Sequence, residues 1–427
     1  MDESNNETLF VRTNKSFIEN SIDDSHGNQF KQQFINNKID LEITDIHNED
    51  KNDDDDDAEV LDDIQCRSIN QNNFIDCMEF ETIPIDHDTA VVNLKRILFG
   101  NAALSIGPEW LHQYFEFDAI NSQLWYGLVQ HKGGPCGVLA SIQAFLCAEF
   151  FHWNRVENIQ NVKDLHRYRN ECLSKAIGNI LWQIKRKDQS VIIAIESQQK
   201  ILDETKDFRF DNITERLRIG RFESKKKLID FLCQIFKHSN KNIGCVSFVY
   251  SCILTRGIEE IQHDYDPGSI QALLTPETLL CSQELVNLCL IGCAVSNVFD
   301  NNLKCDELVL QGVKKQSKIG FLTLYEYGGG AKVGSCYKSP KLPIFVILSE
   351  DHFTVLFAKD KINDDNHHQI ELYYYDGLMN QENEIHLTID TQSCAIHDDK
   401  HRSPLECVIQ TKWPDCHINW NDSNRLF

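Results

Sequence analysis

The chain has 427 residues, a formal net charge of −23 and 41% hydrophobic residues, which suits one large domain or two with a sizeable core. Most of the charge falls within residues 1–90, which hold 24 acidic and 6 basic side chains. The remainder is nearly neutral, which argues against the basic surface typical of proteins that bind nucleic acid.

The 16 cysteines include no CxxC pair, so we expect neither a zinc site nor any other cofactor. Residues 1–5 lack the charged and apolar regions of a signal peptide, and no apolar run approaches about 18 residues. We therefore expect a protein of the cytoplasm, the nucleus or both, not secreted and not inserted in a membrane, with reduced cysteines.

Residues 1–88 are rich in Asn, Asp, Gln and Ser and include an acidic run at 53–57. Such a segment buries too little apolar surface to offset the entropy lost on ordering, which predicts disorder. We expect a single folded domain over 89–427.

Helical patterns dominate the first part of that domain. Residues 90–99 predict a helix ended by Gly100, and residues 108–115 predict another that begins at Pro108. The stripe of apolar side chains within 228–236 predicts a further helix, and Thr275 suits an N-cap followed by Pro276. Residues 191–195 form a lone strand-like run.

The last third of the chain predicts strands at 321–327, 342–348, 353–357 and 370–375, which are β-branched or aromatic runs bounded by turn residues. The fold class is therefore α+β, with a helical half followed by a β-sheet half. Cys136, in Gly-Gly-Pro-Cys at the start of an apolar helical pattern, belongs to the helical half, and a nucleophile at the start of a helix that faces a sheet is the layout of papain-like cysteine hydrolases.

The chain is organised around residues 130–140, where Gln130, a Gly-Gly pair and Pro135 lead to Cys136. Apolar residues then recur with helical spacing, so Pro135 suits the first position of a helix. Unpaired N–H groups and the helix dipole at this end favour an anion, and thus the nucleophilic thiolate of Cys136. The amide of Gln130 could fold back over the glycines and stabilise an oxyanion. The alternative is an ordinary buried cysteine at a Gly-Pro turn.

A thiolate hydrolase needs an imidazole, and His352 opens the strand-like run that follows residues 344–348. If the strands at 353–357 and 370–375 pair antiparallel with Ala358 opposite Ile370, Asp376 lies opposite His352. A carboxylate there would fix the tautomer and orientation of the imidazole. This register is assumed, and Asp376-Gly377 also suits a plain turn.

With these residues assembled, the chain resembles the MINDY family of deubiquitinases, most of all its fourth branch. The resemblance rests on residues 126–140, 344–357, 373–378 and 411–421. It covers about 90–427 and leaves out the acidic N-terminal region. A sister branch has an EF-hand-like insertion, but no Asp-x-Asp-x-Asp-Gly loop occurs here, so no calcium is expected.

The resemblance implies a papain-like thiol hydrolase that cleaves isopeptide bonds in polyubiquitin, with a preference for the proteasome-targeting lysine linkage. It implies that Cys136 is the nucleophile, His352 the base and acid, and Gln130 the oxyanion donor, while the role of Asp376 rests on the strand argument. The expected partners are polyubiquitin chains and ubiquitinated proteins, bound by a monomer. Two alternatives remain open: a ubiquitin-binding scaffold that has lost turnover, and a papain-like peptidase with another substrate.

Overall fold

The computed structural model describes residues 81–82, 87–155, 161–196, 211, 213–238, 243–269, 271–305, 307–362, 368–378, 381–394 and 402–425. Most of the segment expected to be disordered, and all of residues 1–80, lies outside the described residues. The described structure begins before Thr89, because Glu81–Thr82 forms strand β1 and helix α3 begins at His87. The expected boundary at residue 89 therefore falls within the first helix.

The helical part comes first along the chain. Its helices are α3 (His87–Phe99), α4 (Pro108–Leu111), α5 (Cys136–Ala148), α6 (Val162–Ile184), α7 (Lys225–His238), α8 (Cys245–Arg256), α9 (Ile258–Asp264) and α10 (Gln283–Ile291). A π-helical turn, Glu149–Trp153, continues α5, and a 3-10 turn, Thr214–Arg216, precedes β3. The predicted helix at 90–99 is confirmed, and it ends before Gly100, whose φ is 72°. The predicted stripe within 228–236 is the buried face of α7.

A small sheet lies within this helical part, with strand order β1-β3-β2. The strand predicted at 191–195 is β2 (Val191–Glu196), but it is not alone, because it pairs with β3 (Leu217–Phe222). The two-stranded hairpin of β4 (Asn302–Cys305) and β5 (Leu308–Gln311) follows α10.

The second half is a six-stranded sheet with the order β11-β10-β9-β8-β7-β6. Its strands are β6 (Gly320–Thr323), β7 (Ile344–Ser349), β8 (His352–Phe357), β9 (Gln369–Tyr375), β10 (Ile385–Cys394) and β11 (Cys416–Asn419). Neighbouring strands are antiparallel except β6 and β7, which are parallel. Among its described residues, this half has three helices: α11 (Leu324–Tyr327), α12 (Ser335–Lys338) and α13 (Pro404–Lys412).

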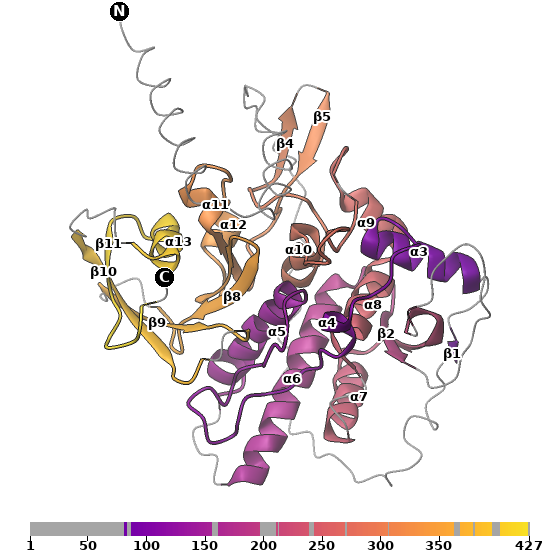
Figure 1. Cartoon of the computed structure of the whole chain (residues 1–427), viewed down its shortest axis with the longest axis horizontal. Helices are drawn as coiled ribbons and strands as arrows, with labels where there is room; N and C mark the ends of the chain where they lie inside the picture. Colours follow the sequence, from indigo (N-terminus) through magenta and orange to yellow (C-terminus); the bar gives the residue numbers. More distant parts are fainter. Residues whose placement is uncertain are drawn as a thin grey trace, which may run out of the picture.

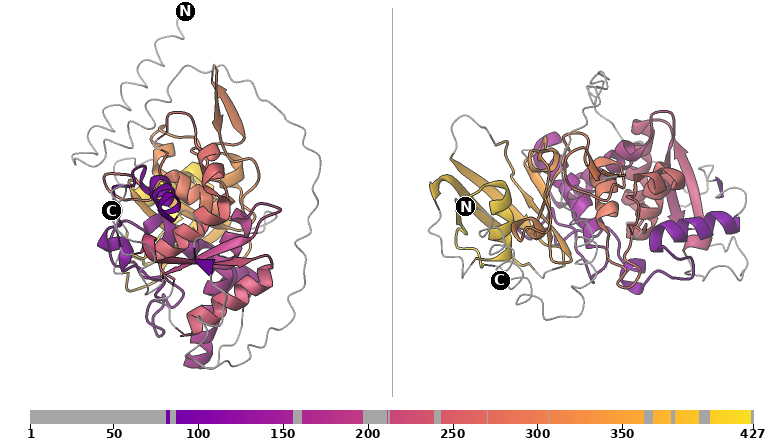
Figure 2. Two further views of the ribbon diagram at one scale, coloured as in Figure 1. Left: turned by 90° about the vertical axis from the view of Figure 1, so that its right-hand side faces the viewer. Right: turned by 90° about the horizontal axis from the view of Figure 1, so that it is seen from above.

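The layers are visible in Figures 1 and 2, where α5 and α6 lie between the large sheet and the group that contains α3, α8 and β2. One core unites α5 with the inner face of the sheet, including Val355 and Phe357 of β8. A second core lies on the other face, where Leu356 packs with Val408 and Ile409 of α13. The mixed helix and sheet content agrees with the predicted α+β class.

Helix α5 differs from its prediction, because all 13 of its residues are buried rather than one face alone. Small side chains, such as Ala140, Ser141 and Ala144, fill the sides away from the predicted stripe, and a helix that is apolar all round belongs in a core. The segment Cys136–Trp153 is even long and apolar enough to cross a membrane. The expectation that no such run exists is therefore wrong, and the structure buries most of this one inside the protein.

Three predicted elements were misplaced, one because of a tertiary contact and two because of local side-chain hydrogen bonds. The helix from Pro108 ends at Leu111, because Tyr114 forms an isolated β-bridge with Gly244. Residues 321–327 are strand only to Thr323, whose hydroxyl accepts the N–H of Tyr325 and starts α11.

Thr275 starts no helix either. Its hydroxyl accepts the N–H of Leu280 at 3.0 Å and closes a turn, and α10 begins only after Ser282, the true N-cap. Strands β3, β10 and β11 and helix α13 were not predicted from the sequence.

Candidate active site

Cys136 is the first residue of α5, as predicted, although Pro135 occupies the N-cap position rather than the first helical one. The turn before it needs a glycine at position 134, whose φ is 115°. The Sγ atom of Cys136 lies 3.9 Å from the carbonyl oxygens of both Gly134 and Asp351. Because Asp351 directly precedes β8, the start of the nucleophile helix and the start of the histidine strand meet at one point.

His352 lies beside both of its expected partners. Its Nε2 is 2.8 Å from Oδ1 of Asp376, and the ring lies close enough to Cys136 for the thiol to act on its pKa. Since Asp376 occupies Nε2, Nδ1 is the nitrogen left for the thiol. The structure thus brings together three of the four residues singled out in the sequence.

The electrostatics of this group favour a charged imidazole. Burial lowers the pKa of His352, but hydrogen bonds to Asp376 and Cys136 and their charges outweigh burial and raise the pKa to about 10. A ring with that pKa is protonated at neutral pH and can hold a thiolate and a carboxylate on its two sides.

The assumed strand register is wrong by two residues, although the contact that it predicted is present. In the structure Val355 pairs with Tyr375 and Phe357 with Tyr373, and the pairing ends there. Asp376 therefore lies diagonally rather than directly opposite His352. A slip of two residues keeps every side chain on its own face, so the carboxylate still reaches the imidazole.

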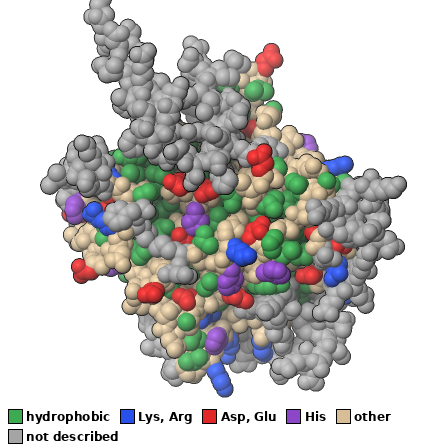
Figure 3. Space-filling model, viewed as in Figure 1, with side chains coloured by type: hydrophobic (Ala, Val, Ile, Leu, Met, Phe, Trp, Pro, Cys, Tyr) green, Lys and Arg blue, Asp and Glu red, His purple; other side chains and the backbone are tan. Residues whose placement is uncertain are grey.

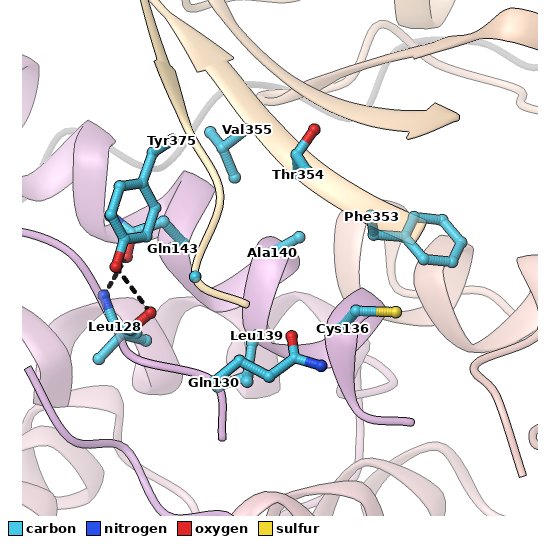
Figure 4. A pocket seen from close by; sticks show the side chains of 11 residues that line it. Leu128, Gln130, Cys136, Leu139, Ala140, Gln143, Phe353, Thr354, Val355 and Tyr375 are labelled. Atoms are coloured by element: carbon cyan, nitrogen blue, oxygen red, sulfur yellow. Dashed lines mark hydrogen bonds between the residues drawn. The ribbon is translucent and has the colours of Figure 1, made fainter. Parts of the chain in front are cut away.

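Gln130 is buried beside Cys136, with its amide extended toward the cysteine (Figure 4). Its Nε2 donates to the carbonyl oxygen of Lys132 at 2.7 Å. An amide nitrogen carries two hydrogens, so this bond orients the group and leaves the second N–H for another acceptor. The pocket around it is also lined by Gln143, Phe353 and Tyr375.

Two buried glutamines near Gln130 were not predicted from the sequence: Gln143, which lines the pocket, and Gln113, which bonds the backbone of Val129 and His131. Gln143 is a polar residue in a helix that is otherwise almost wholly apolar, which was the signal available in the sequence. Among the residues that the structure describes, no group of His, Cys, Asp or Glu is arranged to hold a metal ion. On the described surface in Figure 3, basic side chains are interspersed with acidic ones.

Comparisons with known proteins agree with the resemblance. The family model described as "Deubiquitinating enzyme MINDY-3/4, conserved domain" matches residues 95–422. The probable ubiquitin carboxyl-terminal hydrolase MINDY-4 of Mus musculus is 36% identical over 396 residues, which are 88% of this chain and 53% of the relative. Its Homo sapiens counterpart is 35% identical over 356 residues, 80% of this chain and 46% of the relative.

The ubiquitin carboxyl-terminal hydrolase MINDY-3 of Xenopus tropicalis is 32% identical over 253 residues, 55% of this chain and 57% of the relative. The chain spans about half the length of the curated relatives that it matches. No solved structure matches it. Because the family model covers most of the described domain and the MINDY-4 relatives cover most of the chain, this protein belongs to the MINDY family.

Proposed function

We propose that the chain is a cysteine-type deubiquitinase that hydrolyses the isopeptide bonds of polyubiquitin. The observation that carries the proposal is the position of His352. Its Nε2 lies 2.8 Å from Asp376, and the carbonyl oxygen of the residue before it, Asp351, lies 3.9 Å from the Sγ atom of Cys136. Family membership supplies the substrate class, since the relatives are named as ubiquitin carboxyl-terminal hydrolases.

In the proposed reaction, the Cys136 thiolate attacks the isopeptide carbonyl carbon while His352 holds the thiol proton. The second N–H of Gln130 stabilises the oxyanion that forms on the carbonyl oxygen. Cleavage of the C–N bond then releases the lysine amine, which takes a proton from His352, and leaves ubiquitin as a thioester on Cys136.

Water completes the proposed cycle. His352 removes a proton from the water, which attacks the thioester and releases ubiquitin with a free carboxylate. The Cys136 thiolate leaves as the thioester C–S bond breaks and His352 keeps the proton from water, so the charged pair is restored without a cofactor. Asp376 holds the ring in one orientation through both steps.

The finer parts of the proposal rest on the family resemblance. They are the papain-like fold, the preference for the proteasome-targeting lysine linkage, action as a monomer and residence in the cytoplasm or nucleus. The packing of a nucleophile helix against a mostly antiparallel sheet that carries the histidine supports the papain-like assignment.

The test uses ubiquitin that carries a C-terminal electrophile, followed by polyubiquitin chains of each linkage. Wild-type protein should form a covalent adduct and cleave chains, Cys136→Ala should do neither while still binding them, and Cys305→Ala on β4 should behave as wild type. Chain binding without adduct or cleavage in wild type would indicate a scaffold instead. Thiol-dependent cleavage of other peptides without reaction toward ubiquitin would indicate a peptidase of another class.

A further inference from the structure

The segment 126–131, which carries Gln130, lies between the nucleophile helix and the end of β9. It belongs to no named strand, and its Leu128 makes only an isolated bridge with Phe117. Its buried backbone groups must nevertheless find partners. Five of the nine hydrogen bonds of its backbone groups are to side chains and four are to other backbone groups, a large side-chain share because backbone groups normally pair with other backbone groups.

Gln143 holds the first part of the segment. This side chain is buried about two turns along α5 from Cys136. Its Oε1 accepts the N–H of Leu128 at 2.8 Å, and its Nε2 donates to the carbonyl of Tyr126 at 3.2 Å. Both the oxygen and the nitrogen of one amide therefore bind the same stretch of backbone, and Figure 4 shows Gln143 beside Leu128.

Gln113 holds the second part in the same way. It is also buried, its Oε1 accepts the N–H of His131 at 2.9 Å, and its Nε2 donates to the carbonyl of Val129 at 2.9 Å. The two glutamines thus bind the backbone on both sides of Gln130.

The same segment is tied to the strand that leads to Asp376. The N–H of Gln130 donates to the carbonyl of Gly377 at 2.8 Å, and the hydroxyl of Tyr375 donates to the carbonyl of Leu128 at 2.9 Å. Burial raises the pKa of Tyr375, so its hydroxyl stays protonated and remains a donor. One network therefore connects the helix of Cys136, the loop of Gln130 and the strand end beside Asp376.

We propose that Gln143 and Gln113 are positioning residues, which set the place of the Gln130 amide relative to Cys136. The inference rests on the proposed function of that site. A bidentate amide fixes both the distance and the direction of a peptide segment, and Gln143 shares its helix with the nucleophile. An oxyanion donor must be placed to within a fraction of an ångström, and a displacement of about 1 Å can cost about 10²-fold in rate.

The test begins with Gln143→Met, which keeps the volume and loses both hydrogen bonds. We expect kcat to fall about 10- to 100-fold with little change in KM. In the Gln130→Ala background the same substitution should change kcat little, because its effect acts through Gln130. Alkylation of Cys136 by iodoacetamide, which needs no oxyanion donor, should keep its wild-type rate.

The matched control is Asn287→Leu, since Asn287 is a fully buried amide of α10 that holds the carbonyl of Val295 at 2.8 Å. Asn287→Leu should lower the melting temperature, and its effect on kcat should be the same with and without Gln130→Ala. If Gln143→Met fails to fold, Gln113→Met, outside the core helix, takes its place with the same expectations.

The inference would be overturned if the kcat losses of Gln143→Met and Gln130→Ala multiplied in the double variant. It would also be overturned if Asn287→Leu lost its effect on kcat in the Gln130→Ala background to the same extent as Gln143→Met. Hydrogen exchange separates this failure from failure of the proposed function, because it needs no substrate. Exchange within 126–131 should accelerate in Gln143→Met while α6 stays protected, even if wild type proves inactive toward ubiquitin. Unchanged exchange within 126–131 would by itself refute the positioning role of Gln143.

Discussion

Replacing Asp376 by Asn tests whether the carboxylate serves catalysis or only shapes a turn. Oδ1 of Asp376 accepts from His352 at 2.8 Å and from the N–H of Leu378 at 2.9 Å. An Asn oxygen can keep both contacts, so the turn should survive while the charge is lost. A hydrogen bond to a charged group contributes about 1.5–3 kcal/mol and a neutral one about 0.5–1.5.

The difference of about 1–2 kcal/mol corresponds to a fall of about 5- to 30-fold in kcat/KM. Asp376→Ala also removes the constraint on ring orientation and should cost more, about 10²-fold. Loss of the carboxylate should lower the pKa of His352 from its value of about 10, so the alkaline limb of the rate profile should move to lower pH.

The assay is kcat/KM against pH on a fluorogenic ubiquitin substrate, with the melting temperature of each variant as the control for folding. Wild-type turnover and an unchanged alkaline limb in Asp376→Asn would refute the orienting role. The candidate site would then consist of Cys136, His352 and Gln130, with Asp376 limited to its bond with Leu378.

Three further predictions follow from the same geometry. Gln130→Ala should lower kcat about 10²- to 10³-fold with little effect on KM, and a predominant KM effect in steady-state kinetics would make Gln130 a substrate-binding residue instead. A Cβ at Gly127 would lie 2.2 Å from the Tyr375 ring, so Gly127→Ala should destabilise the protein by about 1–3 kcal/mol in urea unfolding, whereas Gly133→Ala, with nothing within 4 Å, should be nearly neutral. Because the pKa of His352 is raised in the folded state, its protonation should stabilise the protein fully below about pH 6.5, and this advantage over His352→Gln should disappear as pH rises through about 10. Equal differences in melting temperature at pH 6 and pH 10 would contradict that linkage.

The sequence by itself determined which residues could carry the chemistry. Gly-Gly-Pro-Cys before an apolar helix, and a histidine that opens a strand, are local patterns whose meaning depends on neighbouring residues in the chain. The start of α5 at Cys136 and of β8 at His352 agreed with those patterns. Asp376 was found through a register that was wrong by two residues, and it was found because strand periodicity preserves the face under such a slip.

Only the tertiary structure decided how these residues are held. The burial of α5 on every side depends on the sheet and helices around it. The grip of Gln113 and Gln143 on the segment that carries Gln130 joins residues from separate elements. No local pattern encodes such contacts, because a buried amide finds its partners only after hydrophobic packing has brought distant segments together.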